Sequence, residues 1–396
     1  MTTHKRDLAI FVFSPYCLLR PTTNRIFDMR LCDALAGHKQ QVSIVYPYTY
    51  MKDNIKSVHM SNYYALENKV QTRMLYTPLA ENSPKWWRFI WLLAGFKWSV
   101  IMIGLGNIFK RKQLVFISRD AKSLVPALIF RSILGPLCSW KIFFMAAEVK
   151  SSAIYKFVVR KSDGILAGVT TTKEAIRRIV PVDEQKFLLA LAPVPIYKNE
   201  PGKEEARRRI NYSLTNPLVV YTGKLGLEVQ EVRYILEAAG KIPAINFLFT
   251  GGRKSVVEAI KNYCQERNIE NVILTGFFED SRKIRNYQIA ADVLVSYYTS
   301  KDHMIEFNYP QKINEYMSTL NPVLTPDFPA TRDVLNENNV LFVKPDDVQS
   351  LVDGINKLIG DKELSSRLAR QAFEDVKALS FTNRAAEFLR FIKSRI

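Results

Sequence analysis

Short apolar runs alternate with helix-like stretches along the first half of the chain. Such runs are typical of strands buried on both faces, and stretches such as 24–35, which is followed by Gly37, are long enough for crossover helices. The alternation therefore predicts an α/β domain with a parallel sheet. The predicted strands are 8–14, 41–47, 114–119, 141–147, 164–169 and 187–192.

A second α/β series follows a break that is rich in proline and glycine. Residues 192–195 and 199–202 interrupt helices and sheet ladders, so we predict a linker there. The predicted parts are a first domain at 1–195, a linker at 196–216 with a short basic helix, a second domain at 217–380 and a last helix at 381–396. The predicted strands of the second domain are 218–221, 247–250, 272–274, 293–296, 323–325 and 340–343. Its predicted helices include 228–240, 254–268, 281–290 and 310–319.

The stretch 308–326 predicts a loop, a helix, a turn and a short buried strand. Asn308 suits a helix cap, and Pro310 suits the first turn, where its missing N–H costs nothing. The positions expected to face a core are Ile313, Tyr316, Met317 and Leu320. Gln311 and Glu315 lie one turn apart on another face, near the positive end of the helix. That end attracts phosphate, and a carboxylate there accepts hydrogen bonds from sugar hydroxyls. The plain alternative is a capped amphipathic helix on some other α/β sheet.

This stretch resembles the donor-site signature of glycosyltransferase family 4, in the subgroup with the pattern P-S-K-[IL]-x-E-Y-M-A-x-G-x-P-V. Gln311 stands for the serine of the pattern, Ser318 for its alanine and Leu320 for its glycine. The resemblance covers 216–396 well and the first half loosely. It implies the GT-B fold, with two doubly wound Rossmann-like domains facing an interdomain cleft and a final helix that crosses back to the first domain. It also implies a nucleoside-diphosphate-sugar donor, retention of anomeric configuration, and no obligatory metal or other cofactor.

The resemblance assigns donor-binding roles to residues near two further strand ends. Gly223 and Lys224 match the family's glycine and cation, which meets the donor diphosphate; the alternative is an exposed turn lysine. The family's second lysine, six residues on, is Gln230 here. Arg253, after two glycines, is expected to help in its place.

The two family glutamates are out of register in this chain. Glu315 aligns with the ribose-binding one, but eight residues separate it from Glu306, where the family has seven. Either the loop bulges and Glu306 serves near the donor sugar, or the backbone amides of Phe307, Asn308 and Tyr309 do so. Pro310 completes this expected donor site, and His303 either touches the sugar or is a polar loop residue.

The first domain is expected to bind the acceptor. The family's glycine-rich turn after the first strand is absent, and Thr23 and Asn24, with Thr22, are expected to offer side chains there; they are also a plain capping sequence. None of the four histidines follows the strand predicted at 141–147, where the family often has one. Glu148 follows it instead and is the candidate acceptor-side base or substrate contact.

Charge is concentrated in the first half. The chain carries a net charge of +18, and residues 1–200 hold 29 Lys and Arg against 13 Asp and Glu, whereas 201–396 hold 27 against 25. A basic domain favours a polyanionic partner. The four scattered cysteines have no metal-ligand spacing and fit reduced thiols in a cytoplasmic protein, and the polar start predicts no signal peptide.

Residues 84–112 combine tryptophans, apolar runs and cationic flanks, which is typical of a membrane-surface helix. Lys97 near the middle disfavours a span, because a central lysine costs about 2.5 kcal/mol or more. The alternative is a buried helix of the first domain whose Lys97 reaches solvent.

These observations favour a glycosyltransferase at the inner face of the cell membrane. We expect a UDP-sugar donor, rather than GDP-sugar, and a glycolipid or polysaccharide acceptor. A catalytically inactive scaffold in a polysaccharide assembly complex is the alternative, supported by Gln230, the shifted Glu306 and the missing histidine. Nothing resembles a nucleic-acid-binding module, so we expect no nucleic-acid partner.

Overall fold

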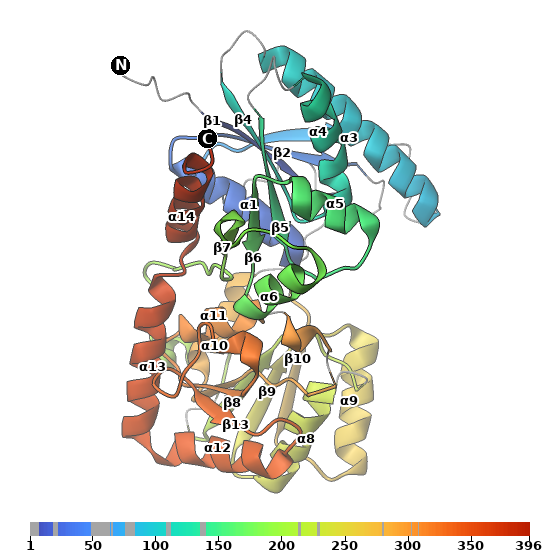
Figure 1. Cartoon of the computed structure of the whole chain (residues 1–396). Coiled ribbons are helices and arrows are strands. Elements are labelled where there is room, and N and C mark those ends of the chain that lie inside the picture. Colours follow the sequence, from blue (N-terminus) through green and yellow to red (C-terminus); the bar gives the residue numbers. More distant parts are fainter. Residues whose placement is uncertain are drawn as a thin grey trace. The chain divides into compact units, whose positions relative to one another are not determined.

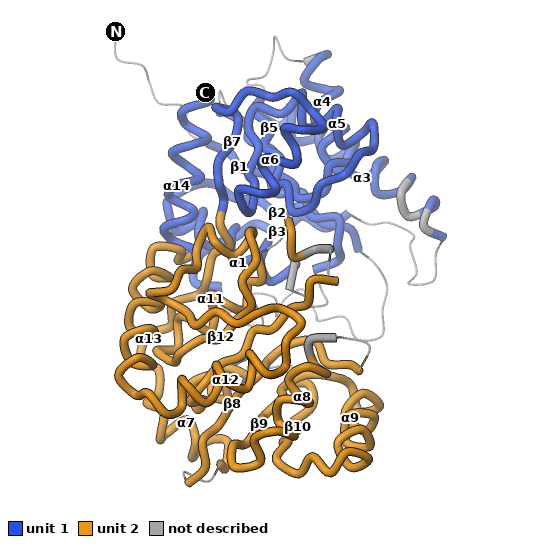
Figure 2. Tube along the Cα trace, turned by 60° about the horizontal axis from the view of Figure 1, so that its bottom comes forward, with its two compact units in different colours: residues 1–190, 381–396 blue, residues 191–380 orange. Residues whose placement is uncertain are grey.

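The computed structural model describes residues 8–18, 23–48, 64, 66–75, 84–107, 112–134, 140–212, 215–227, 230–278, 281–301, 303–307 and 309–396. The chain forms two compact units: unit 1 comprises residues 1–190 with 381–396, and unit 2 comprises 191–380 (Figure 2). Each unit is a parallel sheet with helices (Figure 1).

Unit 1 contains a seven-stranded parallel sheet in the order β3-β2-β1-β4-β5-β6-β7. Its strands are β1 Leu8–Phe13, β2 Gln41–Pro47, β3 Gln71–Leu75, β4 Gln113–Ser118, β5 Trp140–Ala146, β6 Gly164–Ala167 and β7 Phe187–Leu189. Its helices are α1 Thr23–Gly37, α3 Lys85–Asn107, α4 Ala121–Leu134, α5 Ala153–Lys161, α6 Thr170–Ile179, the 3-10 helix Glu184–Lys186 and α14 Phe381–Lys393.

The central strand β1 shows why this sequence forms a doubly covered sheet. All six residues are buried, and alternate side chains enter two separate cores. Ile10 belongs to the core under α1 and α14, whereas Phe11 belongs to the core under α3, α4, α5 and α6. An unbroken apolar run is therefore what this position requires.

Only β3 among the described strands of unit 1 was not predicted from the pattern. Its sequence, QTRML, is polar at three of five positions and its side chains are exposed or half-buried. It pairs on one side only, with β2, so it lies at the sheet edge and carries no apolar run.

Unit 2 contains a six-stranded parallel sheet in the order β10-β9-β8-β11-β12-β13. Its strands are β8 Leu218–Thr222, β9 Asn246–Thr250, β10 Val272–Gly276, β11 Val293–Val295, β12 Val323–Pro326 and β13 Leu341–Val343. Its helices are α7 Lys203–Arg209, α8 Gln230–Lys241, α9 Lys254–Glu266, α10 Ser281–Ala290, α11 Gln311–Met317, α12 Val348–Gly360 and α13 Lys362–Lys377, with 3-10 helices at His303–Glu306 and Pro329–Thr331.

Both sheets reverse their strand order at one place. In unit 1 the chain runs outward from β1 to β3 and then restarts with β4 on the other side of β1; in unit 2 the same occurs between β8 and β11. Loops at the carboxyl ends of the two strands diverge at such a switch point, which leaves room for a ligand. The interdomain cleft stays a prediction.

Candidate functional site

Two glycine turns meet at the carboxyl ends of β8 and β9. Gly223, Gly251 and Gly252 have φ of +150°, +133° and +76°. A Cβ on Gly251 would lie 2.0 Å from the carbonyl oxygen of Gly223, so a side chain there would displace backbone. The backbone N–H of Gly223 also donates to the Thr250 carbonyl oxygen at 3.0 Å. This packing brings exposed Lys224 and exposed Arg253, the two predicted cations, to the same sheet edge.

Helix α11 is joined to the end of β8 by Tyr316. The Thr222 N–H donates to the Tyr316 hydroxyl at 2.8 Å, and that hydroxyl lies 3.2 Å from the Thr222 carbonyl oxygen, which accepts from it. Tyr316 is fully buried, and burial raises its pKa, so it stays neutral. This contact holds the last turn of α11 beside the end of β8, at the switch point of unit 2.

Lys312, in the first turn of α11, was given no role from the sequence. Its Nζ donates to the Tyr221 hydroxyl at 3.1 Å and lies 4.2 Å and 4.9 Å from the ring centres of Tyr221 and Tyr298. It also lies 3.5 Å from the position that a Cβ on Gly223 would take. A third cation is therefore beside the glycine turn. Its place two residues after Pro310, within the signature, was the signal that could have found it.

A buried arginine, Arg285, holds the carboxyl end of α11. Arg285 donates to both carboxylate oxygens of Glu200, at 2.5 and 2.7 Å. The same guanidinium donates to the carbonyl oxygens of Glu315 at 2.8 Å and Ser318 at 2.7 Å. A bidentate pair of this kind fixes orientation as well as distance. Sequence reasoning missed it because Glu200 lies 85 residues from Arg285.

The remaining predicted donor residues fall on or before α11. Glu315 is on the helix and half-buried, and Pro310 is half-buried directly before it. The prediction that Asn308 caps the helix was wrong: Pro310 occupies the N-cap position, because α11 begins at Gln311. Asn308 itself lies outside the described residues. Tyr309 is buried, and its hydroxyl donates to Asn314 Oδ1 at 2.6 Å.

The loop before Asn308 leaves both alternatives for the first glutamate open. Glu306 ends a 3-10 helix and is exposed, whereas Phe307 is half-buried in a turn. His303 starts that 3-10 helix, and its side chain lies outside the described part.

Leu320 does not face the core, contrary to the prediction. Its side chain is 53% exposed and its φ is +59°, in the left-handed region. Ile313, Tyr316 and Met317 are fully buried as expected. The helix ends at Met317, so the helical spacing does not extend to Leu320. The chain turns there with a backbone conformation that suits the glycine of the resembled signature.

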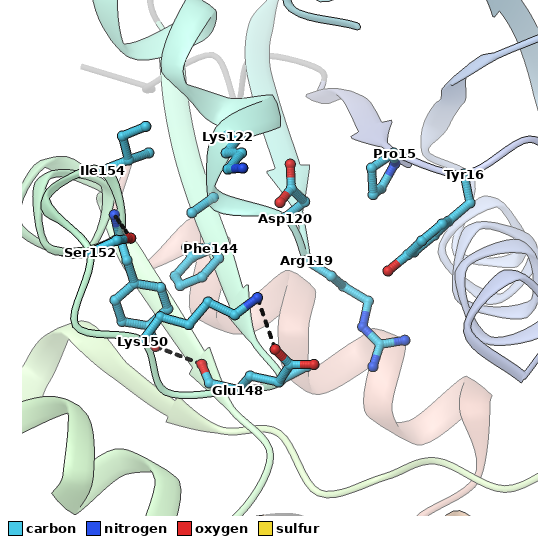
Figure 3. Close-up of a pocket in the computed structure, with 13 residues that line it drawn as sticks. Pro15, Tyr16, Arg119, Asp120, Lys122, Phe144, Glu148, Lys150, Ser152 and Ile154 are labelled. Atoms are coloured by element: carbon cyan, nitrogen blue, oxygen red, sulfur yellow. Dashed lines mark hydrogen bonds and ion pairs between the residues drawn. The ribbon is translucent and has the colours of Figure 1, made fainter. Parts of the chain in front are cut away.

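Glu148 lies in a pocket of unit 1, where loops after β1, β4 and β5 meet (Figure 3). Its carboxylate is 2.9 Å from Lys150 Nζ, and its carbonyl oxygen accepts from the Tyr155 hydroxyl at 2.9 Å. Thr23 and Asn24 are the first two residues of α1, and their side chains are not described. Glu148 therefore lines this pocket, whereas Thr23 and Asn24 are not among its described lining residues.

Helix α3 has one buried and one exposed apolar face. Phe96, Val100 and Ile103 are in the core, whereas Trp98 and Leu105, about one half-turn away, are 64% and 52% exposed. By length and composition, the window Ile90–Asn107 is apolar enough to cross a membrane, with a hydropathy of 1.4 and 22% of it buried.

Comparisons with known proteins agree with this architecture. Residues 216–361 match the family model described as Glycosyl transferases group 1. The chain is 23% identical over 226 residues to TuaC of Bacillus subtilis (strain 168), a glycosyltransferase assigned to teichuronic acid biosynthesis. That match covers 57% of this chain and spans about half, 54%, of the relative.

Two solved structures resemble nearly the whole chain. Sucrose-phosphate synthase of Thermosynechococcus elongatus is 17% identical, with a TM-score of 0.73 and coverage of 98% of this chain and 99% of that one. HepE of Anabaena, solved in complex with UDP, is 13% identical, with a TM-score of 0.73 and coverage of 98% and 100%. The predicted GT-B fold class is confirmed, and residues 216–361 confirm the predicted glycosyltransferase domain.

Proposed function

We propose that this chain, which carries a group 1 glycosyltransferase domain at 216–361, is a retaining enzyme of glycosyltransferase family 4. It moves a sugar from a UDP-sugar to a lipid-linked or cell-surface polysaccharide acceptor. The observation that carries this proposal is the Tyr316–Thr222 contact, which brings α11 to the Gly223 turn. UDP is favoured because HepE was solved with UDP, and the acceptor class follows the assignment of TuaC to teichuronic acid biosynthesis.

The cations of unit 2 act on the leaving group in this proposal. When the bond from the anomeric carbon to the diphosphate oxygen breaks, that oxygen keeps the electron pair and gains negative charge. Lys224, Arg253 and Lys312 stabilise this charge, and no step requires a metal. Glu315 accepts hydrogen bonds from the ribose hydroxyls, and Glu306 or the amides of 307–309 contact the donor sugar. The acceptor hydroxyl forms the new bond and loses its proton to a base, for which Glu148 is the candidate.

Nucleotide binding tests the donor site directly. The full chain is heated alone and with UDP, GDP, ADP and UDP-sugars. A ligand at a hundred times its Kd adds about 2.7 kcal/mol to the stability of the folded state, so UDP is expected to raise the melting temperature by several degrees. No shift with any nucleoside diphosphate or nucleotide sugar would contradict the proposal.

An inactive scaffold remains the second candidate, because Gln230 replaces the family's second lysine and Glu306 is out of register. The Glu315→Ala variant separates the two. An enzyme loses slow donor hydrolysis and transfer, whereas a scaffold has neither activity before the change and keeps its partner binding after it.

The exposed face of α3 supports peripheral contact with an anionic membrane at the cytoplasmic face. Trp86, Trp87, Ile90, Trp98, Met102 and Leu105 are all exposed on this helix. Ile129 and Ile133 of α4, which packs against α3, are 49% and 65% exposed. Tryptophans at a surface flanked by cations, on the basic half of the chain, fit a bilayer interface.

Flotation with liposomes tests the membrane contact. The protein is expected to bind vesicles containing anionic lipid and to bind neutral vesicles less. Trp98→Ser with Leu105→Ser should weaken this binding at least tenfold. Lys241→Ser in unit 2, on an exposed residue, serves as the control. Equal binding by the double variant and the original chain would rule out α3 as the contact.

A further inference from the structure

A pocket at the switch point of unit 1 combines cations with an apolar wall. It has a volume of about 120 Å³, well above the 10–15 Å³ that one water molecule needs. The loops after β1 and β4 supply Tyr16 and Arg119, and the first turn of α4 supplies Lys122. The loop after β5 supplies Lys150, and the start of α5 supplies Ile154. In Figure 3, Tyr16 lies on one side and Ile154 on the other, and the Tyr16 hydroxyl points into the space between them.

The charges that line this pocket sum to a positive value. Arg119, Lys122 and Lys150 oppose two carboxylates, those of Asp120 and Glu148. Asp120 is engaged at the start of α4, where its Oδ2 accepts from the Ser123 N–H at 2.9 Å and its hydroxyl at 2.8 Å. This leaves the pocket attractive to an anion.

One of the two opposing carboxylates, that of Glu148, is already paired with a lysine of the pocket. Lys150 donates to Glu148, and this hydrogen bond raises the pKa of Lys150, so its ammonium stays charged. Arg119 also interacts electrostatically with the buried carboxyl of Asp28, whose pKa burial raises to about 6.

The uncharged wall of the pocket suits a sugar ring. Tyr16 is 42% exposed and Ile154 is 38% exposed, whereas Phe144 is buried among the lining residues. Pockets that combine such a wall with a few placed polar groups fix the orientation of a small ligand. An aromatic face with a hydroxyl at its edge can cover a ring and still reach a polar substituent.

We infer that this pocket binds an acidic sugar of the acceptor, with Lys122 and Lys150 contacting its carboxylate or phosphate. The inference rests on the proposed function and names the acceptor's chemical class: a saccharide that carries an oxyanion next to the ring. The acid comes either from a uronic acid or from the phosphate of a lipid carrier. Arg119 adds a third positive charge to the lining of the pocket.

Isoleucine methyl NMR of the full chain tests binding without any donor. Ile154 reports on the pocket, and Ile129 of α4 serves as the reference outside it. Glucuronate, glycerol 3-phosphate and glucose are titrated at constant ionic strength. We expect a saturable shift of the Ile154 methyl with at least one acid, at concentrations tenfold below those needed for glucose. A response to glucuronate would identify the bound oxyanion as the carboxylate of a sugar acid. A response to glycerol 3-phosphate would identify it as a phosphate.

Charge variants identify the contacting residues. Lys122→Ala and Lys150→Ala alter exposed side chains, and each should weaken the Ile154 response about tenfold. Lys161→Ala removes the same charge from an exposed position at the end of α5 and should leave it unchanged. Equal responses to glucose and to the acids, or no response, would overturn the inference. Because no nucleotide is present, such a result would leave the outcome of the UDP stabilisation test unaffected. Likewise, a failure of the UDP test would not alter the response of the Ile154 methyl to an acid.

Discussion

The Tyr316 hydroxyl accepts a hydrogen bond from the backbone N–H of Thr222 at 2.8 Å, although 94 residues separate them. Thr222 ends β8, and β11 pairs with β8 only as far as Val220. The side chain therefore takes the place of a neighbouring strand at the switch point. This contact joins the signature helix to the glycine turn that carries Lys224.

Replacing Tyr316 with phenylalanine is expected to destabilise unit 2. The change leaves the buried Thr222 N–H without its partner, at a cost of about 1–3 kcal/mol. The melting temperature should fall, and the Thr222 amide should exchange its hydrogen faster. Tyr234→Phe alters a half-buried tyrosine of the same unit and should change stability by less than about 0.5 kcal/mol. Unchanged exchange at Thr222 would show that the hydroxyl does not protect it.

Replacing Lys312 with glutamine is expected to weaken UDP binding. A charge-assisted hydrogen bond to diphosphate contributes about 1.5–3 kcal/mol, so Kd should rise about 10- to 100-fold. Calorimetric titration with UDP and with uridine measures the effect, and the uridine affinity should change little because it lacks the phosphates. Lys241→Gln, an exposed charge at the end of α8, is the matched control. Equal losses for UDP and uridine would mean that Lys312 supports the fold rather than the diphosphate.

Replacing Leu320 with glycine is expected to stabilise unit 2. At a φ of +59° a leucine is strained by about 1–2 kcal/mol, and its 53% exposed side chain contributes little burial. Glycine also makes the unfolded chain more flexible, which offsets part of the relieved strain. We therefore expect the free energy of unfolding to rise by about 0.5–1 kcal/mol. Urea unfolding measures it. Leu320→Ala keeps the Cβ and should show no gain; a gain for alanine as large as for glycine would exclude the strain explanation.

Replacing Asp28 with asparagine is expected to change how stability depends on pH. Burial raises the pKa of Asp28 from 3.8 to about 6, while Arg119 and the Ser14 hydroxyl oppose the shift. The folded state then holds this proton more tightly than the unfolded state, so the contribution of Asp28 falls as pH rises from about 4 to 6 and is constant above. The loss corresponds to about 3 kcal/mol at most.

Other carboxyl groups titrate over the same range, so the comparison is between variants. The free energy of unfolding is measured by urea from pH 4 to 7.5 for both proteins. The original chain should lose stability relative to Asp28→Asn across pH 4–6. Parallel curves for the two proteins would refute the shifted pKa.

Most of the strands were predictable because each is a nearly continuous apolar run that two cores bury on both faces. The edge strand β3 was not, since a strand with one neighbour needs no apolar run. Within the signature, the period of 3.6 residues correctly identified Ile313, Tyr316 and Met317 as buried. It failed at Leu320, because the helix ends three residues earlier and local spacing carries no information beyond that end.

The sequence by itself determined the two α/β series, the signature helix and the unequal distribution of charge. These features depend on neighbouring residues or on composition, and both can be read directly from the amino-acid sequence. Only the tertiary structure decided that Lys312 lies beside Gly223, that Arg285 links Glu200 to α11, and that Lys122 and Lys150 line one pocket. Parallel strands bring their carboxyl ends together from distant parts of the chain, so the partners at a switch point share no sequence spacing.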